Sequence, residues 1–224
     1  MGMPGESQEG QRIVSSIQEH VAQVRRLLGD ALPARALFER YRPEREWFLQ
    51  PDCAEDIHGI DHEARVLIWQ ELLARLLIKG GAALDQEALR WAAATHDTQR
   101  VSHGIDFPHG QRAAAWVKRH LLHRIPVDSL DTVLYLNIWH VPFDDQAPEM
   151  TPELAVFKDA DSLDRVRIDD LNARYLRCHY SQTLLQYLAQ ELFDRSEAKR
   201  WSEGYATFDC VCAAAMDMGL IRPD

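Results

Sequence analysis

Residues 61–79 (DHEARVLIWQELLARLLIK) are apolar around most of a helical circumference. The stretch contains no proline or glycine, and Gly80-Gly81 follows it directly. A helix of this length that is apolar on nearly every side must be covered by other elements on all of those sides. The sequence therefore predicts a domain in which the remaining elements pack around a central helix at residues 61–79.

The rest of the chain has the periodicity of helices and almost none of the alternation of strands. Apolar residues recur at intervals of three and four, and proline or glycine separates the periodic segments. Besides the central helix, the predicted helices cover residues 11–28, short pieces of 33–50, and 85–97, 109–123, 127–141, 154–165, 171–193 and 201–220. We therefore expect an all-α, single-domain helical bundle of about eight to ten helices over residues 11–224, after a disordered tail at residues 1–10.

Composition excludes several classes of protein. With 224 residues, 46% of them hydrophobic, the chain can bury a sizeable core. Its formal net charge of −10 disfavours binding to duplex nucleic acid, and no apolar run is long enough to span a membrane. The N-terminus lacks a signal-peptide core, and the four scattered cysteines are expected to be reduced thiols. These features predict a cytoplasmic protein and leave its oligomeric state open, a homodimer included.

His96 and Asp97 stand at the end of the alanine-rich helix predicted at residues 85–97, whose start Asp85 can cap. An imidazole and a carboxylate that are removed from water need a partner that satisfies both, and a divalent metal ion is one such partner. The alternative is structural, with His96 bonded to a backbone carbonyl and Asp97 starting the next turn. For a His-Asp pair taken alone, the structural alternative is the commoner outcome.

Two more segments place histidine or aspartate on helices that are predicted to be buried. The sequence HEARV begins at His62, and DADSLD covers residues 159–164, with Asp161 as its third residue. In chain order, these two segments and the pair His96-Asp97 resemble the motif of the HD-domain superfamily of metal-dependent phosphohydrolases. The resemblance spans about residues 58–165. It implies that His62, His96, Asp97 and Asp161 are the ligands of a divalent metal ion.

One branch of that superfamily holds two metal ions, and its extra histidines lie on the helices between the HD pair and the last aspartate. His109 and His140 have these places in the present sequence. The resemblance thus implies one or two ions, and mixed His/Asp ligation suits Mn²⁺, Fe²⁺, Ni²⁺, Co²⁺ or Zn²⁺ better than Mg²⁺. The alternatives are that His109 binds a substrate phosphate and that His140 caps its helix.

Cations beside the motif segments are candidates for binding a substrate phosphate. They are Arg65, Arg100 and Arg165, whose guanidinium groups can hold phosphate oxygens in a bidentate manner. For Arg65 a structural salt bridge is an equal alternative. His58 precedes His62 by one helical turn and is expected to face the same cleft.

The sequence also predicts the positions of three acidic residues near the ligands. Asp61 should cap the helix that carries His62, and Asp159 should lie at the surface, two positions from the inward-facing Asp161. Asp164 lies one helical turn from Asp161 and is placed to orient a ligating histidine.

The resemblance implies hydrolysis of a small phosphate ester or a nucleotide by a metal-activated water. Asp97, His109 and His58 are the candidate catalytic residues, and the substrate can be a monoester or a diester. Two other functions remain open: a di-iron oxygenase of the HD type, which has the same order of ligands, and a non-catalytic metal-binding or sensor module. No segment of the sequence identifies the substrate.

Overall fold

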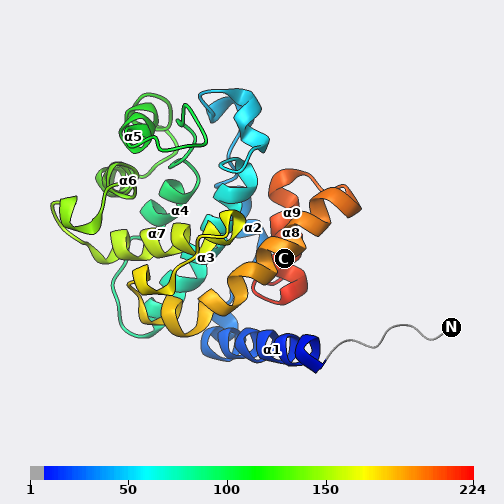
Figure 1. The fold of residues 1–224 in the computed structure, drawn as a ribbon. Helices are drawn as coiled ribbons and strands as arrows, with labels where there is room; N and C mark the ends of the chain where they lie inside the picture. The colour runs from blue at the N-terminus through cyan, green and yellow to red at the C-terminus, as the bar shows by residue number, and fades with distance from the viewer. Residues whose placement is uncertain (1–7) are drawn as a thin grey trace.

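The computed structural model describes residues 8–224, and this part of the chain contains nine α-helices and no β-strand (Figure 1). The predicted all-α bundle is confirmed. The predicted tail at residues 1–10 lies outside the described residues as far as residue 7, and Gln8 already belongs to the first helix. The helices are α1 (Gln8–Leu28), α2 (Arg35–Glu39), α3 (Ile60–Lys79), α4 (Gln86–Ala93), α5 (His109–His120), α6 (Val127–Trp139), α7 (Pro152–Leu163), α8 (Gln186–Glu203) and α9 (Thr207–Met218).

Short helical pieces connect the α-helices. Six of them are 3₁₀ segments: η1 (Gly29–Ala31), η2 (Arg45–Trp47), η3 (Pro51–Glu55), η4 (Asp144–Gln146), η5 (Asp164–Ile168) and η6 (Ala173–Tyr175). A π-helical turn, η7 (Ser181–Leu185), leads directly into α8. The segment predicted to hold one or two short helices within residues 33–50 contains α2 and η2.

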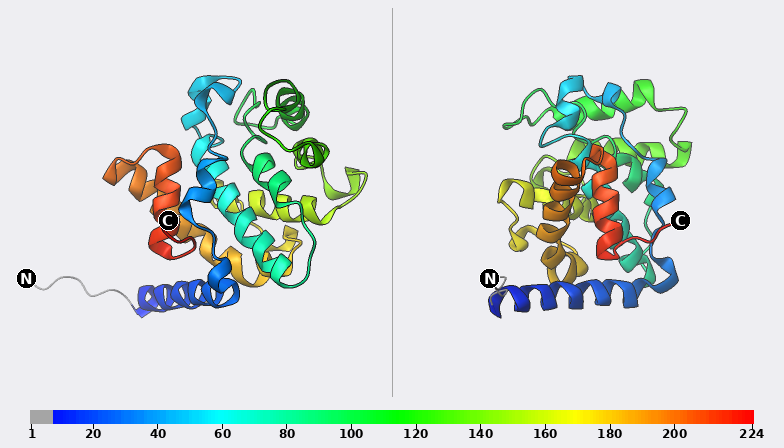
Figure 2. Two further views of the ribbon diagram at one scale, coloured as in Figure 1. Left: turned by 180° about the vertical axis from the view of Figure 1, so that it is seen from behind. Right: turned by 90° about the vertical axis from the view of Figure 1, so that its right-hand side faces the viewer.

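Helix α3 is the centre of the bundle, as the sequence predicts. Every residue from Asp61 to Ala74 is buried. Helices α4, α7 and α9 pack against α3, and α1 lies across one end of the bundle, where it contacts α3 and α8 (Figure 2). Helices α5 and α6 pack on each other beyond α4, and α8 packs on α9. One continuous apolar core joins these layers.

The starts of α4 and α7 follow from side chains that cap them. The carboxylate of Asp85 accepts a hydrogen bond from the Ala88 amide at 2.9 Å. The hydroxyl of Thr151 accepts one from the Leu154 amide at 3.1 Å, with Pro152 in the first turn. These caps fix the two helices that carry the HD pair and Asp161.

The helices predicted at residues 171–193 and 201–220 are wrong in their bounds. Residues 171–178 contain only the 3₁₀ segment η6 and no α-helix, because Asp159 accepts hydrogen bonds from the amides of Arg177 and Cys178. Helix α8 starts only at Gln186 and continues to Glu203, so that Trp201 belongs to it. Gly204, with φ of +74°, ends α8 before α9 begins.

Two expectations for acids near the ligands are also wrong. Gly59, not Asp61, occupies the N-cap of α3, and Asp61 is buried against the guanidinium of Arg200 at 2.5 Å. Asp159 is fully buried and not at the surface. In both cases a partner distant in the sequence draws the carboxylate inward, and helical periodicity alone cannot show such a partner.

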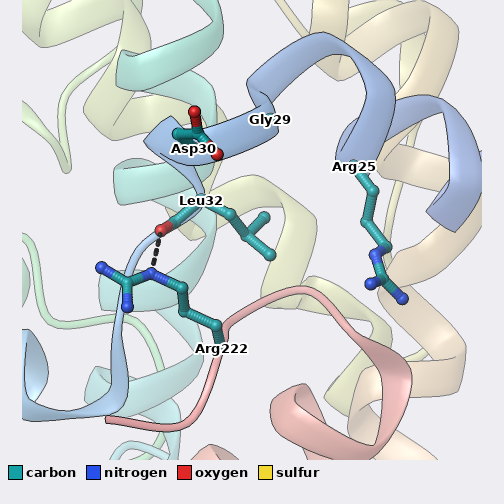
Figure 3. Close-up of a pocket in the computed structure, with 5 residues that line it drawn as sticks. All are labelled: Arg25, Gly29, Asp30, Leu32 and Arg222. Carbon is teal, nitrogen blue, oxygen red and sulfur yellow. Dashed lines mark hydrogen bonds between the residues drawn. The ribbon is translucent and has the colours of Figure 1, made fainter.

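The end of the chain returns to the segment after α1. The Nε atom of Arg222 donates a hydrogen bond to the carbonyl of Leu32 at 3.2 Å, beside a surface pocket that Arg25 also lines (Figure 3). None of the site residues predicted from the sequence lines this pocket. In the described part of the chain, no helix combines the length and the apolar character that crossing a bilayer requires.

Candidate metal centre

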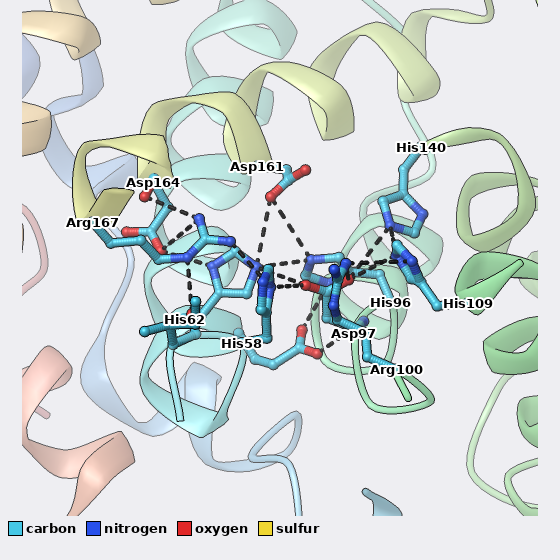
Figure 4. Close-up of polar contacts among 12 residues, drawn as sticks. His58, His62, His96, Asp97, Arg100, His109, His140, Asp161, Asp164 and Arg167 are labelled. Atoms are coloured by element: carbon cyan, nitrogen blue, oxygen red, sulfur yellow. Dashed lines mark hydrogen bonds and ion pairs between the residues drawn. The ribbon is translucent and has the colours of Figure 1, made fainter. Parts of the chain in front are cut away.

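Six predicted ligands from five parts of the fold come together at one place (Figure 4). They are His62 in the first turn of α3, His96 and Asp97 in the turn after α4, His109 at the start of α5, His140 at the end of α6, and Asp161 in α7. All are buried except Asp161, whose side chain is 25% exposed. The loops between these elements differ greatly in length, so the packing of the helices explains the convergence: α4 and α7 pack on α3, α6 packs on α4, and α5 packs on α6.

Four of these side chains form a first group of donor atoms. His62 Nε2 lies 3.1 Å from His96 Nε2 and 3.6 Å from each of Asp97 Oδ2 and Asp161 Oδ1. His96 Nε2 lies 3.9 Å from Asp161 Oδ1. Ligand atoms that surround one transition-metal ion at about 2.0–2.2 Å stand about 3–4 Å from one another. The spacing of this group therefore fits a single ion.

A second group shares Asp97 with the first. Asp97 Oδ1 lies 2.8 Å from His109 Nε2 and 3.7 Å from His140 Nε2, and the two nitrogens are 2.9 Å apart. Asp97 thus presents one oxygen to each group. Such a carboxylate can bridge two ions, each bound by histidines on its own side.

The hydrogen bonds on the outer side of the four histidines determine which nitrogen carries the proton. The Nδ1 atoms of His62, His109 and His140 form hydrogen bonds with Asp164 Oδ2 at 2.7 Å, the Asp106 carbonyl at 2.6 Å and the Asn137 carbonyl at 2.7 Å. The Nδ1 of His96 forms one with the Ala93 carbonyl at 3.2 Å and lies 2.7 Å from Glu63 Oε2, with which it can form an ion pair. Each Nδ1 therefore donates, which leaves a lone pair on the Nε2 of a neutral ring. These lone pairs face one another and two carboxylates inside the bundle. The donor set fits a metal ion, because positive charge is what this arrangement requires.

Protons are the other source of positive charge at the cluster. Burial lowers the pKa of His96, but the carboxylates of Glu63, Asp97 and Asp161 outweigh burial and raise that pKa to about 10. Burial lowers the pKa of His140 to about 4 and holds the pKa of His62 well below its usual range. Without a metal, His96 is thus the ring that holds the proton at neutral pH.

We expect the free energy of unfolding of chelator-treated protein to fall as the pH rises above about 6.5. His96 has a pKa near 6.5 when unfolded and about 10 when folded, so its stabilisation is complete below pH 6.5 and is lost as the pH approaches 10. The slope should approach 1.4 kcal/mol per pH unit at most, the value of about one proton. Denaturant unfolding between about pH 7 and pH 9 measures it. Glu63→Gln should flatten the slope, and an unchanged slope in that variant would contradict this assignment.

Asp164 connects the first group to the buried arginines behind it. It accepts hydrogen bonds from His62 Nδ1 at 2.7 Å and from Arg65 Nε at 2.5 Å. The expected contact between Asp164 and a candidate ligand is confirmed. Arg65 is buried and makes the structural salt bridge that the sequence left open as the alternative to phosphate binding.

The other candidate residues lie at different distances from the ligands. His58 Nδ1 is 2.6 Å from Asp97 Oδ2, although α3 begins only after His58. Arg100 Nη1 is 3.4 Å from Asp97 Oδ1, close to the second group. Arg165 does not contact the cluster: its guanidinium pairs with Asp170 on the wall of a neighbouring cavity.

Sequence reasoning missed two residues that touch the cluster. Glu63 is fully buried, and besides its contact with His96 it accepts a hydrogen bond from the Asp97 amide at 3.1 Å. An acid inside an otherwise apolar helix was the signal that could have found it. Arg167 Nη2 lies 3.2 Å from His58 Nδ1. Arg167 belongs to the 3₁₀ segment η5, where no periodicity marks an inward-facing residue.

A cavity of about 660 Å³ reaches the centre at His140 and Asp161. Its walls carry cationic side chains from α7, η5 and the segment around η6: Lys158, Arg165, Arg174 and Arg177. Four aspartates line the same cavity, Asp144, Asp145, Asp161 and Asp170, so its walls carry charges of both signs beside the candidate ligands.

Comparison with known proteins adds no relative. The chain matches no protein-family model, no curated protein and no solved structure. The geometry itself provides buried groups of histidine and aspartate that could hold a metal ion. The centre is thus a candidate metal site within an all-α fold.

Proposed function

We propose that this chain is a metal-dependent phosphohydrolase of the HD-domain type that hydrolyses a small phosphate ester or a nucleotide. The observation that carries the proposal is Asp97, which presents one carboxylate oxygen to each of two groups of histidine Nε2 atoms. The order of the donors along the chain, H…HD…H…H…D, is that of the two-metal branch which the sequence resembles.

The first group would hold one ion and the second group another, with Asp97 shared between them. Bound there, the ions lower the pKa of a water molecule and neutralise charge on a phosphoryl group. Both oxygens of Asp97 are then used as ligand atoms. We therefore assign Asp97 as a shared ligand rather than as the acceptor of a proton, and His109 as a ligand rather than as a phosphate-binding residue.

Two neighbouring side chains remain for the substrate and the proton. His58 Nδ1 lies within hydrogen-bond distance of Asp97 Oδ2, so that Nε2 of the same ring is available to hold a proton for the leaving group. Arg100 is 14% exposed and lies beside Asp97, where its guanidinium can hold phosphoryl oxygens. We assign His58 Nε2 to proton transfer and Arg100 to positioning of the phosphate.

The neighbouring cavity supports an anionic substrate. Lys158 and Arg177 are both paired with Asp144, and Arg165 is paired with Asp170. Among the described residues, no acid pairs with the guanidinium of Arg174, which lies on the same wall and is exposed. Arg174 is therefore available to a substrate phosphate, although the carboxylate of Asp145, which lines the same cavity, also lacks a cationic partner among the described residues.

The same donors also suit two iron ions, so an oxygenase of the HD type is the competing function. The test uses purified protein that is stripped with a chelator, reloaded with Mn²⁺, Fe²⁺ or Co²⁺, and assayed on phosphomonoesters, phosphodiesters and nucleotides. We expect phosphate release that depends on metal, is lost in His62→Ala and is kept in His123→Ala, which changes an exposed histidine. Oxygen consumption by the iron-loaded protein, without hydrolysis of any ester, would contradict the proposal and support the oxygenase.

The second group also predicts the number of ions. Titration of stripped protein with Mn²⁺ should saturate at two equivalents per chain, and the double variant His109→Ala, His140→Ala should saturate at one. His109 and His140 present Nε2 to Asp97 Oδ1, and the double variant retains His62, His96, Asp97 and Asp161, so the first group should keep its ion. Saturation at one equivalent in the unmodified chain would mean that the centre is mononuclear.

A further inference from the structure

A second cluster of metal-binding donors lies outside the centre described above. It consists of Cys53 in η3, Asp56 just after η3, and His103 in the loop between α4 and α5. One donor atom from each side chain lies within 4.8 Å of the other two, and His103 Nε2 is 3.2 Å from Asp56 Oδ2. The three residues come from two segments that are far apart in the sequence, so the fold brings them together.

The donor types differ from those of the His/Asp centre. A thiol, an imidazole and a carboxylate are together a donor set typical of Zn²⁺ and of the softer transition ions, with a fourth position left to water. Hard cations such as Mg²⁺ and Ca²⁺ avoid sulfur. His103 and Asp56 are about half exposed, so an ion can reach the cluster directly from solvent.

Little else holds the loop of His103 against η3. The apolar side chains of this loop, Val101, Ile105 and Phe107, are more than half exposed and contribute little packing. His103 joins the two segments through its contact with Asp56. Three ligands on one ion would connect the segments far more strongly than this exposed pair does.

We propose that Cys53, Asp56 and His103 form a separate site for one thiophilic divalent ion, with Zn²⁺ as the best match. The site adjoins the proposed proton-transfer residue: the ring of His103 stacks on that of His58, with centroids 6.2 Å apart and planes 9° apart. Binding there fixes the loop of His103 next to His58. The ion is additional to those of the His/Asp centre and does not replace them.

Cobalt spectroscopy separates the two kinds of site, because only this cluster contains sulfur. Stripped protein kept under reducing conditions is titrated with Co²⁺ while the near-ultraviolet absorption is recorded. A sulfur-to-cobalt charge-transfer band should grow to saturation in the unmodified chain and be lost in Cys53→Ser. The matched control is Cys178→Ser, which changes the other half-buried cysteine and should leave the band intact.

His103→Ala provides a second measurement that does not require replacement of the half-buried Cys53. Because it removes one of three ligands, it should raise the Kd for Co²⁺ at the sulfur band at least about tenfold, which is the lower range for loss even of an indirect partner. The exposed His123→Ala should not change it. Cobalt binding without the band in the unmodified chain, survival of the band in Cys53→Ser, or an unchanged Kd in His103→Ala would each overturn the proposal.

Discussion

Replacing Asp97 with alanine is expected to abolish phosphatase activity, by at least about 10³-fold, together with the binding of both ions. Asp97 presents a carboxylate oxygen to each of the two groups of donors. Loss of His62 or His140 removes a ligand from one group only, whereas loss of Asp97 removes one ligand from each. Phosphate release is measured with the substrate found in the ester screen, and the metal content is measured on the same sample. Both values are compared between Asp97→Ala and the unmodified chain.

The same variant should still fold into a helical domain that melts cooperatively. Asp97 lies in the turn after α4, outside the apolar core, and the raised-pKa ring of His96 keeps Glu63 as a buried partner when Asp97 is gone. Asp128→Ala, which changes an exposed acid in α6, is the matched control and should behave like the unmodified chain. Collapse of the helical signal in Asp97→Ala, with and without metal, would show that the residue serves the fold instead.

Reloading stripped protein with metal should raise its melting temperature strongly. A ligand that binds only the folded state, at about 1,000 times its Kd, adds about 4 kcal/mol per site. For a chain of this size, each kcal/mol shifts Tm by about 2–4 °C, so one site predicts a rise of about 8–16 °C. The rise follows from the Nε2 atoms of the four histidines, which a metal ion binds through their lone pairs once the proton on His96 is released.

Variants should show how much of the rise in melting temperature comes from each of the two groups of donors. The double variant His109→Ala, His140→Ala should keep about the shift of one site, and Asp97→Ala should lose nearly all of it. Calorimetry with and without Mn²⁺ measures both. A Tm that does not respond to Mn²⁺, Fe²⁺, Co²⁺ or Zn²⁺ in the unmodified chain would be inconsistent with a metal centre.

The features that the sequence predicted well are those that depend on residues within a single helix. The apolar circumference of residues 61–79 predicted the central helix, and Asp85 predicted the start of α4 through its capping side chain. The packing of α4 and α7 on α3, of α6 on α4 and of α5 on α6 then brings the six candidate ligands together (Figure 4).

The features that sequence failed to predict depend on partners distant in the chain. Asp159 is buried because it binds the amides of Arg177 and Cys178, and the same contacts prevent an α-helix at residues 171–178. In the sequence, Glu63 cannot be distinguished from the other acids of the helix, and only the structure shows its contact with His96. Periodicity and capping rules describe residues within one element, so they carry no information about such pairs.

Diffraction from crystals of the Mn²⁺-loaded protein, recorded to reveal anomalous scattering, tests the central claim most directly. We predict two peaks of anomalous scattering, one on either side of the Asp97 carboxylate. One should lie about 2.0–2.3 Å from His62 Nε2 and His96 Nε2, and the other at a similar distance from His109 Nε2 and His140 Nε2. The absence of any peak at bonding distance from Asp97, at a Mn²⁺ concentration that saturates the protein in solution, would contradict the assignment of this cluster as a metal centre.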